Sequence, residues 1–355
     1  MDYTTRALQE QTLAFWATVV AFVLGAVAAT LAFGSAVRPF SGAHSITAIA
    51  APITGGTAAL AFVISSLLHR RGETQLMPDW QAWISHVSFG ALTLAFGGVS
   101  ALSVLVAGDL LGSGLPGLEL GAMGGGLVAG VAAALGGRFA FQAATDLRTA
   151  DLAALLFTFL VVGTVYAMLT AAEPTWWERN FSQLGIGDGA WAFNGTLVVA
   201  GLLVGTIGSY IGRDLHRLLD DAALPRIAGV VVVWALAGLA LAAVGWFPLY
   251  TRPVPHTVAA FAALALLLGA AGWLQYVLPG TPFVLKAVTM LLVSLVAVAL
   301  LFTFAVPVLS VTALESVVVG LTLLWLTTFV RVLSILTPNR TVTSQRRHLM
   351  QHVGR

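Results

Sequence analysis

Two connectors between apolar stretches, residues 173–188 and 245–256, hold most of the polar side chains that could recognise or transform a ligand. The candidate ligand-binding residues in them are Arg179, Asn180, Ser182, Asp188, Arg252 and His256. Guanidinium groups pair with phosphate or carboxylate, amides and hydroxyls donate and accept hydrogen bonds, and histidine exchanges protons near neutral pH. Together these residues predict a site that recognises a polar headgroup.

A catalytic use of the same residues is a second hypothesis. Acyl transfer needs a nucleophile, a base within hydrogen-bond reach and a group that orients the base. The matching residue types are Ser182, His256 and either Asp188 or Glu178. A structural use is a third hypothesis and the simplest one, because Asn180, Ser182 and His256 could tie the two connectors together through hydrogen bonds. The sequence favours a binding protein over an enzyme.

The composition excludes several kinds of site. The chain contains no cysteine, so it has no disulfide, thiolate nucleophile or cysteine-ligated metal. A metal site built from His44, His256 and a carboxylate lacks any diagnostic spacing, and neither a metal nor an organic cofactor is expected. The glycines within 121–130 do not form a nucleotide-binding loop, because they lie inside an apolar stretch with no following Lys-Ser or Lys-Thr pair. We interpret them as helix-packing residues.

The elements that position these residues are apolar stretches long enough to cross a membrane. Hydrophobic residues make up 58% of the chain and charged residues 9%. A bilayer core about 30 Å thick needs roughly 20 apolar residues per helix, whereas barrel strands are about half as long and alternate in polarity. We predict an all-α, polytopic membrane bundle of about ten transmembrane helices. The predicted spans lie near residues 13–33, 46–68, 84–106, 117–137, 152–172, 190–211, 227–249, 257–278, 283–305 and 312–336.

The basic residues predict how these helices are oriented. With a cytoplasmic amino terminus, only Arg38, Arg179 and Arg252 of the seventeen Lys and Arg residues lie outside, and the other fourteen lie inside. This bias is the positive-inside signal of membrane proteins. An even number of spans also places the carboxyl terminus in the cytoplasm. Both polar connectors are therefore predicted to face the extracytoplasmic side.

The helices offer few ionisable groups for ion coupling. Proton pumps and ion-coupled transporters usually keep titratable side chains deep in the bilayer. Here His86, Lys286, Glu119 and Glu315 lie toward the ends of their predicted spans, where interfacial side chains are common. The sequence therefore argues against proton coupling and leaves a transporter or flippase of another kind open.

Two similar motifs raise the hypothesis of an internal repeat. Arg38-Pro39 with His44 follows the first predicted span, and Arg252-Pro253 with His256 follows the seventh. Inverted and parallel repeats are common in transporters. Short matches among apolar helices also arise by chance, so the motifs leave the question open.

Several short motifs fall within the last six predicted spans. They are Asn180-x-Ser182-x-Leu184-Gly185, Trp191 with Phe193-Asn194, a Gly-x-Phe-Pro-like turn at Gly245 to Pro248, and His256 at the start of a helix. In these motifs the stretch from about 151 to 336 resembles the prokaryotic membrane family catalogued as domain of unknown function 998. More distantly, it is similar to the membrane group that contains GPI-lipid remodelling and autophagy-modulator proteins. The resemblance implies a six-helix unit and no particular reaction.

These observations predict three parts in the chain. Residues 1–150 form four transmembrane helices, residues 151–336 form the six-helix unit, and residues 337–355 form a basic cytoplasmic tail. Lys286 is the one lysine, and arginine-rich composition is typical of GC-rich prokaryotic genomes. We therefore expect a multi-pass protein of a prokaryotic cytoplasmic membrane.

The predicted function is the binding or handling of a lipid headgroup, or of another amphipathic ligand, at an extracytoplasmic pocket. The alternatives are a transporter or flippase without proton coupling, and a membrane-embedded hydrolase or transferase that uses Ser182 and His256. Expected partners are membrane lipids, with a second copy of the chain or another membrane protein as further candidates. Nucleic acid is not expected as a partner.

Overall fold

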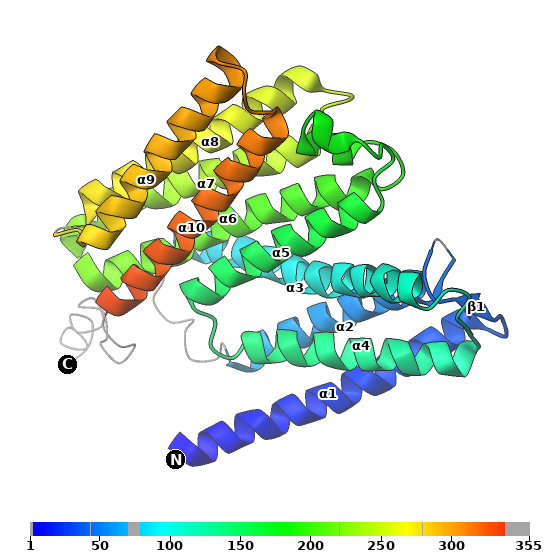
Figure 1. Ribbon diagram of the computed structural model, residues 1–355. Coiled ribbons are helices and arrows are strands. Elements are labelled where there is room, and N and C mark those ends of the chain that lie inside the picture. The colour runs from blue at the N-terminus through cyan, green and yellow to red at the C-terminus, as the bar shows by residue number, and fades with distance from the viewer. Residues whose placement is uncertain (1–2, 43, 70–78, 220, 279, 338–355) are drawn as a thin grey trace. The chain divides into compact units, whose positions relative to one another are not determined.

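A computed structural model of the chain describes residues 3–42, 44–69, 79–219, 221–278 and 280–337. Within these ranges the chain is almost entirely helical, and ten helices are long and apolar enough to cross a membrane (Figure 1). This confirms the predicted fold class. The helices are α1 (Tyr3–Phe33), α2 (Ile46–His69), α3 (Asp79–Gly114), α4 (Ala122–Ala143), α5 (Thr149–Leu169), α6 (Ala190–Leu219), α7 (Leu224–Trp246), α8 (Pro253–Val277), α9 (Phe283–Leu300) and α10 (Val311–Leu336).

A two-stranded ribbon changes the start of the fourth span. β1 (Arg38–Pro39) pairs antiparallel with β2 (Glu119–Leu120), so residues 117–121, which were predicted to be helical, form a turn and a short strand instead. As a result α4 begins only at Ala122. The two motifs of the suggested repeat also differ in secondary structure, because Arg38-Pro39 is a strand whereas Pro253 is the first residue of α8.

The chain divides into two compact units. The amino-terminal unit contains Met1–Leu147 and Thr158–Leu169, and the carboxyl-terminal unit contains Arg148–Phe157 and Thr170–Arg355. Helix α5 therefore contributes residues to both. Since the last five helices and the polar connectors all belong to the carboxyl-terminal unit, the candidate site lies there.

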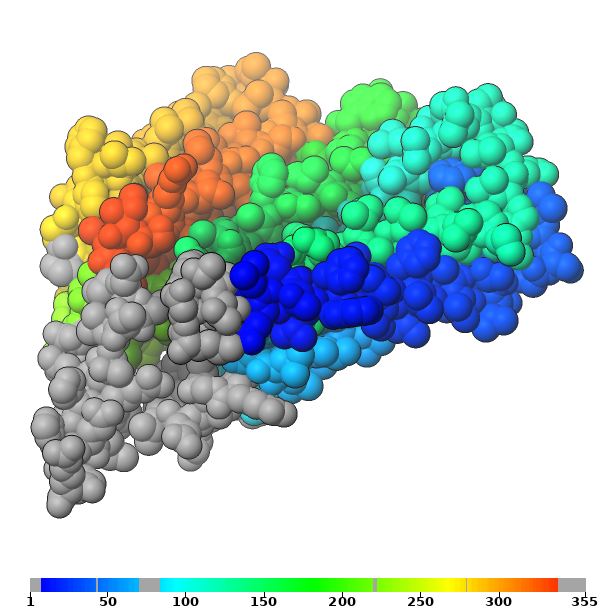
Figure 2. Space-filling model, turned by 90° about the horizontal axis from the view of Figure 1, so that it is seen from below, coloured from blue at the N-terminus to red at the C-terminus, as the bar shows by residue number. Residues whose placement is uncertain are grey.

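Small residues let the helices of the amino-terminal unit approach closely. In the space-filling view α1, in dark blue, lies along α4 (Figure 2). Gly126 of α4 faces Thr30 of α1 so closely that a Cβ atom would collide with its hydroxyl. Gly55 of α2 and Gly97 of α3 face each other in the same way. These contacts support the interpretation of the α4 glycines as packing residues.

The carboxyl-terminal unit combines close helix contact with a buried aromatic core. Gly201 of α6 lies against Gly238 of α7, where a side chain on either residue would collide with backbone. Trp234 of α7 stacks on Trp325 of α10 with ring centroids 6.3 Å apart, and Trp325 stacks on Phe329 at 5.3 Å. These contacts fix α6, α7 and α10 as a framework for the connectors at their ends.

The polar connectors gather at one end of the carboxyl-terminal unit, where α6, α8 and α10 begin (Figure 1). The longer connector contains two 3₁₀ turns, η2 (Trp176–Glu178) and η3 (Phe181–Gly185). The shorter connector joins α7 to α8. A π-helical turn, η5 (Leu301–Ala305), ends α9 before the chain enters α10. We call residues 170–189, 247–252 and 306–310 the loop end.

Candidate functional site

His256 lies on the first turn of α8 and is only 5% exposed. Pro253 begins the helix, where its missing N–H costs nothing and its fixed φ favours the helical conformation. The imidazole Nδ1 lies 3.0 Å from the carbonyl oxygen of Val244 and 2.9 Å from that of Phe247. The last carbonyls of a helix have no partner within that helix. His256 therefore caps the end of α7 from its position in the first turn of α8.

The two carbonyls determine which nitrogen of His256 carries the proton. A carbonyl oxygen only accepts hydrogen bonds, so Nδ1 must be the protonated, donating nitrogen. In the neutral ring Nε2 is then an acceptor with a free lone pair. The hydroxyl of Ser182 lies 2.9 Å from this Nε2 and donates a hydrogen bond to it. The serine is 8% exposed, so the pair is largely shielded from solvent.

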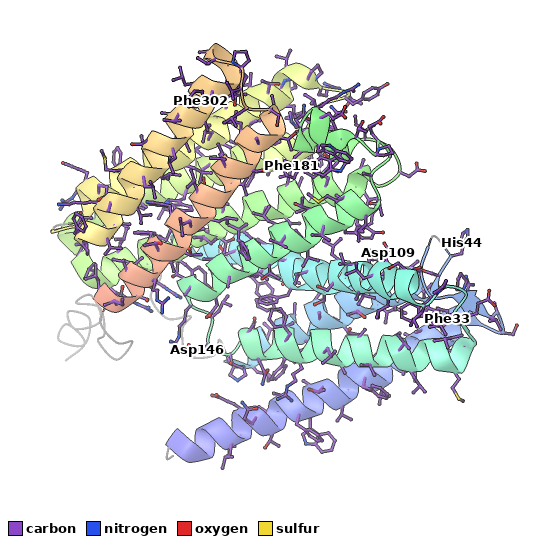
Figure 3. All side chains as sticks on the ribbon, in the orientation of Figure 1. Phe33, His44, Asp109, Asp146, Phe181 and Phe302 are labelled. Atoms are coloured by element: carbon purple, nitrogen blue, oxygen red, sulfur yellow. The ribbon has the colours of Figure 1, made fainter. Side chains whose placement is uncertain are left out.

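Contacts with α10 hold Ser182 in place. The Phe181 N–H donates to the Glu315 carboxylate at 2.7 Å, and the Thr312 hydroxyl donates to the Trp177 carbonyl at 2.7 Å. The Trp176 ring also packs on Phe181, with centroids 5.1 Å apart. Figure 3 shows Phe181 beside the beginning of α10. Thus α10 holds the connector on one side and His256 holds it on the other.

Asn180 has a buried acceptor without a partner in the described part of the chain. Its Oδ1 is inaccessible to solvent and accepts no hydrogen bond, although Asn180 comes immediately before η3 and two residues before Ser182. Leaving such an acceptor unpaired costs about 1–3 kcal/mol. A hydrogen-bond donor would therefore stabilise this atom, and a ligand could supply one only if the turn opens enough to admit it.

Gly185 lies in close contact with α6, which leaves no room for a side chain at this position of the connector. It packs on the side chain of Asn194 in α6, where a Cβ atom would lie 2.7 Å from the Asn194 Oδ1. The Asn194 amide also donates to the Gly185 carbonyl over 3.4 Å. A residue larger than glycine would push η3 away from α6, so this contact fixes the position of the turn that carries Ser182.

The structure brings some of the predicted site residues together and leaves others at the surface. Ser182 and His256 are hydrogen-bonded, and Asn180 belongs to the same turn as Ser182. The side chains of Arg179, Asp188 and Arg252 lie at the loop end and are exposed. Neither Asp188 nor Glu178, the predicted orienting acids, is hydrogen-bonded to Nδ1 of His256. Two main-chain carbonyls accept from Nδ1 instead.

Sequence reasoning missed the residues that hold the turn. Glu315 was expected to be an interfacial side chain, yet it accepts the Phe181 N–H. Thr312, one turn earlier on α10, has no sequence feature that marks it as a partner of the connector. A carboxyl group inside an apolar span was the available signal, because such a group is expensive there unless it has a partner. That signal does not identify the partner.

The described residues offer no cluster of three or more His, Asp or Glu side chains that could hold a metal ion. His44, the other histidine of the hypothetical metal site, belongs to the amino-terminal unit and is exposed.

Comparison with known proteins supports the resemblance of the carboxyl-terminal region. A family model described as a protein of unknown function, DUF998, matches residues 152–332. The match covers Ser182, His256 and Glu315 together with the helices that position them. No curated protein matches the chain, and no solved structure does. The distant similarity to GPI-lipid remodelling proteins stays a prediction.

Proposed function

The chain belongs to the DUF998 family, and we propose that its carboxyl-terminal unit binds the polar head of an amphipathic molecule at the loop end. The observation that carries the proposal is the buried Ser182–His256 pair, together with the unpartnered acceptor of Asn180 two residues before Ser182. Burying polar groups is costly unless hydrogen bonds compensate for the loss of water. A ligand that donates to Asn180 would supply the missing bond.

Two exposed arginines at the loop end could pair with an anionic headgroup. Arg179 comes directly before Asn180, and Arg252 comes directly before the first turn of α8. Both guanidinium groups are exposed and free to reach a phosphate or carboxylate outside the buried pair. Trp177 and Trp246 are also exposed at this end. Tryptophan is enriched where membrane meets water, so the loop end fits the level of lipid headgroups.

Under this proposal the loop end faces the extracytoplasmic side of a prokaryotic cytoplasmic membrane. The support is the basic-residue bias, which leaves Arg179 and Arg252 on the side opposite most of the positive charge. A ligand would keep its acyl tail in the lipid and present its head to the loop end. The transporter and flippase hypotheses require in addition a polar route across the membrane.

The test measures lipid binding by the purified full-length protein. The protein in detergent would be titrated with lysophosphatidylglycerol and, separately, with an uncharged monoacylglycerol. Native mass spectrometry would measure the fraction of protein with lipid bound. We expect the anionic lipid to bind more tightly, and the R179A/R252A double variant to lose at least about tenfold in affinity, or about 1.4 kcal/mol. Arg226→Ala, which removes an exposed arginine from the other end of α7, is the matched control. Equal binding by wild type and the double variant would contradict the proposed role of the arginines, and no binding of either lipid would contradict the proposal.

A further inference from the structure

We propose that Ser182 is a nucleophile that cleaves a carboxylic ester in the bound amphipathic molecule, with Nε2 of His256 as its base. This inference rests on the proposed function, because it needs a ligand seated at the loop end. It goes further by assigning a reaction and a substrate class, an O-acyl ester. The geometric observation behind it is the 2.9 Å contact between the Ser182 hydroxyl and Nε2.

The ring of His256 is prepared for proton transfer. Nδ1 donates to the carbonyls of Val244 and Phe247 and is thereby fixed as the protonated nitrogen. A nucleophilic serine needs this arrangement, in which the opposite nitrogen is bare and faces the hydroxyl. Rotation of the ring would break both bonds to α7, so the lone pair stays directed at Ser182.

The Val244 and Phe247 carbonyls can also stabilise a positively charged His256 ring, as the carboxylate does in a serine–histidine–acid triad. When Nε2 accepts a proton, the imidazolium gains positive charge. Two carbonyl oxygens at the end of α7 point their negative ends at Nδ1, and the end of a helix carries partial negative charge. The positive ring is therefore stabilised without Asp188 or Glu178, whose side chains are exposed.

The proposed reaction balances in two steps. The Ser182 oxygen attacks the ester carbonyl carbon while its proton passes to Nε2, and the C–O bond to the alcohol then breaks as Nε2 returns the proton to the departing oxygen. This leaves an acyl-serine and a free alcohol. Water next attacks the acyl carbon and gives one proton to Nε2. The bond between that carbon and the Ser182 oxygen then breaks as Nε2 returns the proton to Ser182, and a carboxylic acid is released. No oxidant, metal or cofactor is needed.

The position of the Ser182–His256 pair fits the ester of a membrane lipid better than a substrate dissolved in water. The ester groups that join lipid heads to acyl chains lie in the interfacial layer, between the hydrocarbon core and water. Ser182 and His256 lie where helices α6 and α8 begin, next to exposed Trp177 and Trp246. A headgroup on Arg179 or Arg252 would leave the ester on the membrane side of the head, toward the buried pair.

The main competing account is that the same hydrogen bond only ties the connector to α8. Both accounts predict some loss of stability when the bond is removed. They differ in reactivity, because an unactivated serine does not react with an alkyl fluorophosphonate, whereas a nucleophilic serine forms a covalent adduct. Reactivity toward this probe is therefore the readout that a structural role would not change.

The experiment exposes the full-length protein, in detergent or lipid nanodiscs, to a long-chain alkyl fluorophosphonate. Intact mass measures the rate of modification, and peptide mass spectrometry of the wild type locates the adduct. We expect one adduct on Ser182, none on S182A, and at least about a hundredfold slower modification of H256Q, since general-base assistance contributes about 10²–10⁴-fold. Glutamine keeps one donor and one acceptor in place of the ring. Ser316→Ala, which removes an exposed serine of α10, should react like the wild type.

Other results would overturn the inference. A folded wild type that resists the probe, or an adduct on a serine other than Ser182, would show that the pair is only structural. An H256Q variant that is modified as fast as the wild type would exclude His256 as the base. Lysophosphatidylglycerol binding by the same samples separates the two proposals. Binding without modification would contradict only the catalytic step, whereas loss of both would contradict the proposed function as well.

Discussion

The Ser182 hydroxyl and the His256 Nε2 lie 2.9 Å apart, although 74 residues separate them in the chain. Each partner is fixed from its other side, Ser182 through the turn held by α10 and His256 through the carbonyls that end α7. The hydrogen bond thus joins three parts of the carboxyl-terminal unit. Several consequences can be measured without knowing the ligand.

Glu315 should stabilise the turn that carries Ser182. Glu315→Ala removes the acceptor of the Phe181 N–H, a bond to a charged group that contributes about 1.5–3 kcal/mol. We expect a lower thermal unfolding temperature and faster hydrogen exchange at Phe181. E315Q keeps an oxygen acceptor and should lose less, and the exposed Glu178→Gln should change neither quantity. If E315A exchanges at the wild-type rate, the Glu315 contact does not hold the turn.

Thr289 is the centre of a polar cluster inside the unit. Its hydroxyl donates to the Leu285 carbonyl and accepts from the Trp325 indole N–H and the Gln275 amide, so all its bonding positions are used. Thr289→Val has nearly the same shape, but it leaves the Trp325 indole N–H unpaired and leaves the Gln275 amide only its longer, 3.4 Å bond to the Leu285 carbonyl. We expect it to cost about 1–3 kcal/mol in the free energy of unfolding, measured by titration with SDS in mixed micelles.

The control for this substitution is Thr303→Val. Thr303 is also buried, but its hydroxyl bonds to the Ala299 carbonyl one turn back in its own helix. Its loss should be smaller, since no indole or amide donor is left unpaired. Equal costs for the two variants would mean that the bonds from Trp325 and Gln275 add nothing.

The contact of α6 with α7 depends on the absence of side chains. Gly201→Ala would place a methyl group against the backbone of Gly238 and Ala242, so the helices must separate. Overpacking of this kind typically costs about 1–3 kcal/mol. Gly195→Ala, on the same helix, meets no other heavy atom within 4 Å and should be neutral or stabilising. The same SDS titration distinguishes them, and a tolerated G201A would contradict the close approach.

The orientation of the helices can be tested because the chain has no cysteine of its own. Thr175→Cys introduces a thiol at the loop end, and Ala222→Cys introduces one in η4 (Asp221–Ala223), between α6 and α7. A membrane-impermeant maleimide should label T175C in intact cells and A222C only after permeabilisation. The reverse pattern would place the loop end in the cytoplasm and contradict the proposal.

The sequence was sufficient to predict the ten helices, because a span of about 20 apolar residues has few other stable structures. It also singled out Ser182 and His256, which the structure joins by a hydrogen bond. The ends of the helices were harder to predict where a membrane span meets a turn or a short strand. The pairing of Glu119 with Pro39, for example, depends on residues 80 positions apart and leaves no local pattern.

The partners of the site residues could not be read from the sequence. His256 bonds to two main-chain carbonyls, and every residue has such a carbonyl, so no side-chain type marks Val244 or Phe247 as its partners. Glu315 bonds to a main-chain N–H for which the same is true. An acidic residue was the natural expectation for Nδ1, and the helix end provides the acceptors instead.

The most direct test of the central claim is to find where an amphipathic ligand touches the protein. A lysophosphatidylglycerol with a photoreactive diazirine next to its headgroup would be crosslinked to the full-length protein in nanodiscs and located by peptide mass spectrometry. The account predicts adducts concentrated on residues 173–188 and 245–256, and competed away by unlabelled lysophosphatidylglycerol. Adducts spread over all lipid-facing helices, with no excess at these two connectors, would contradict it.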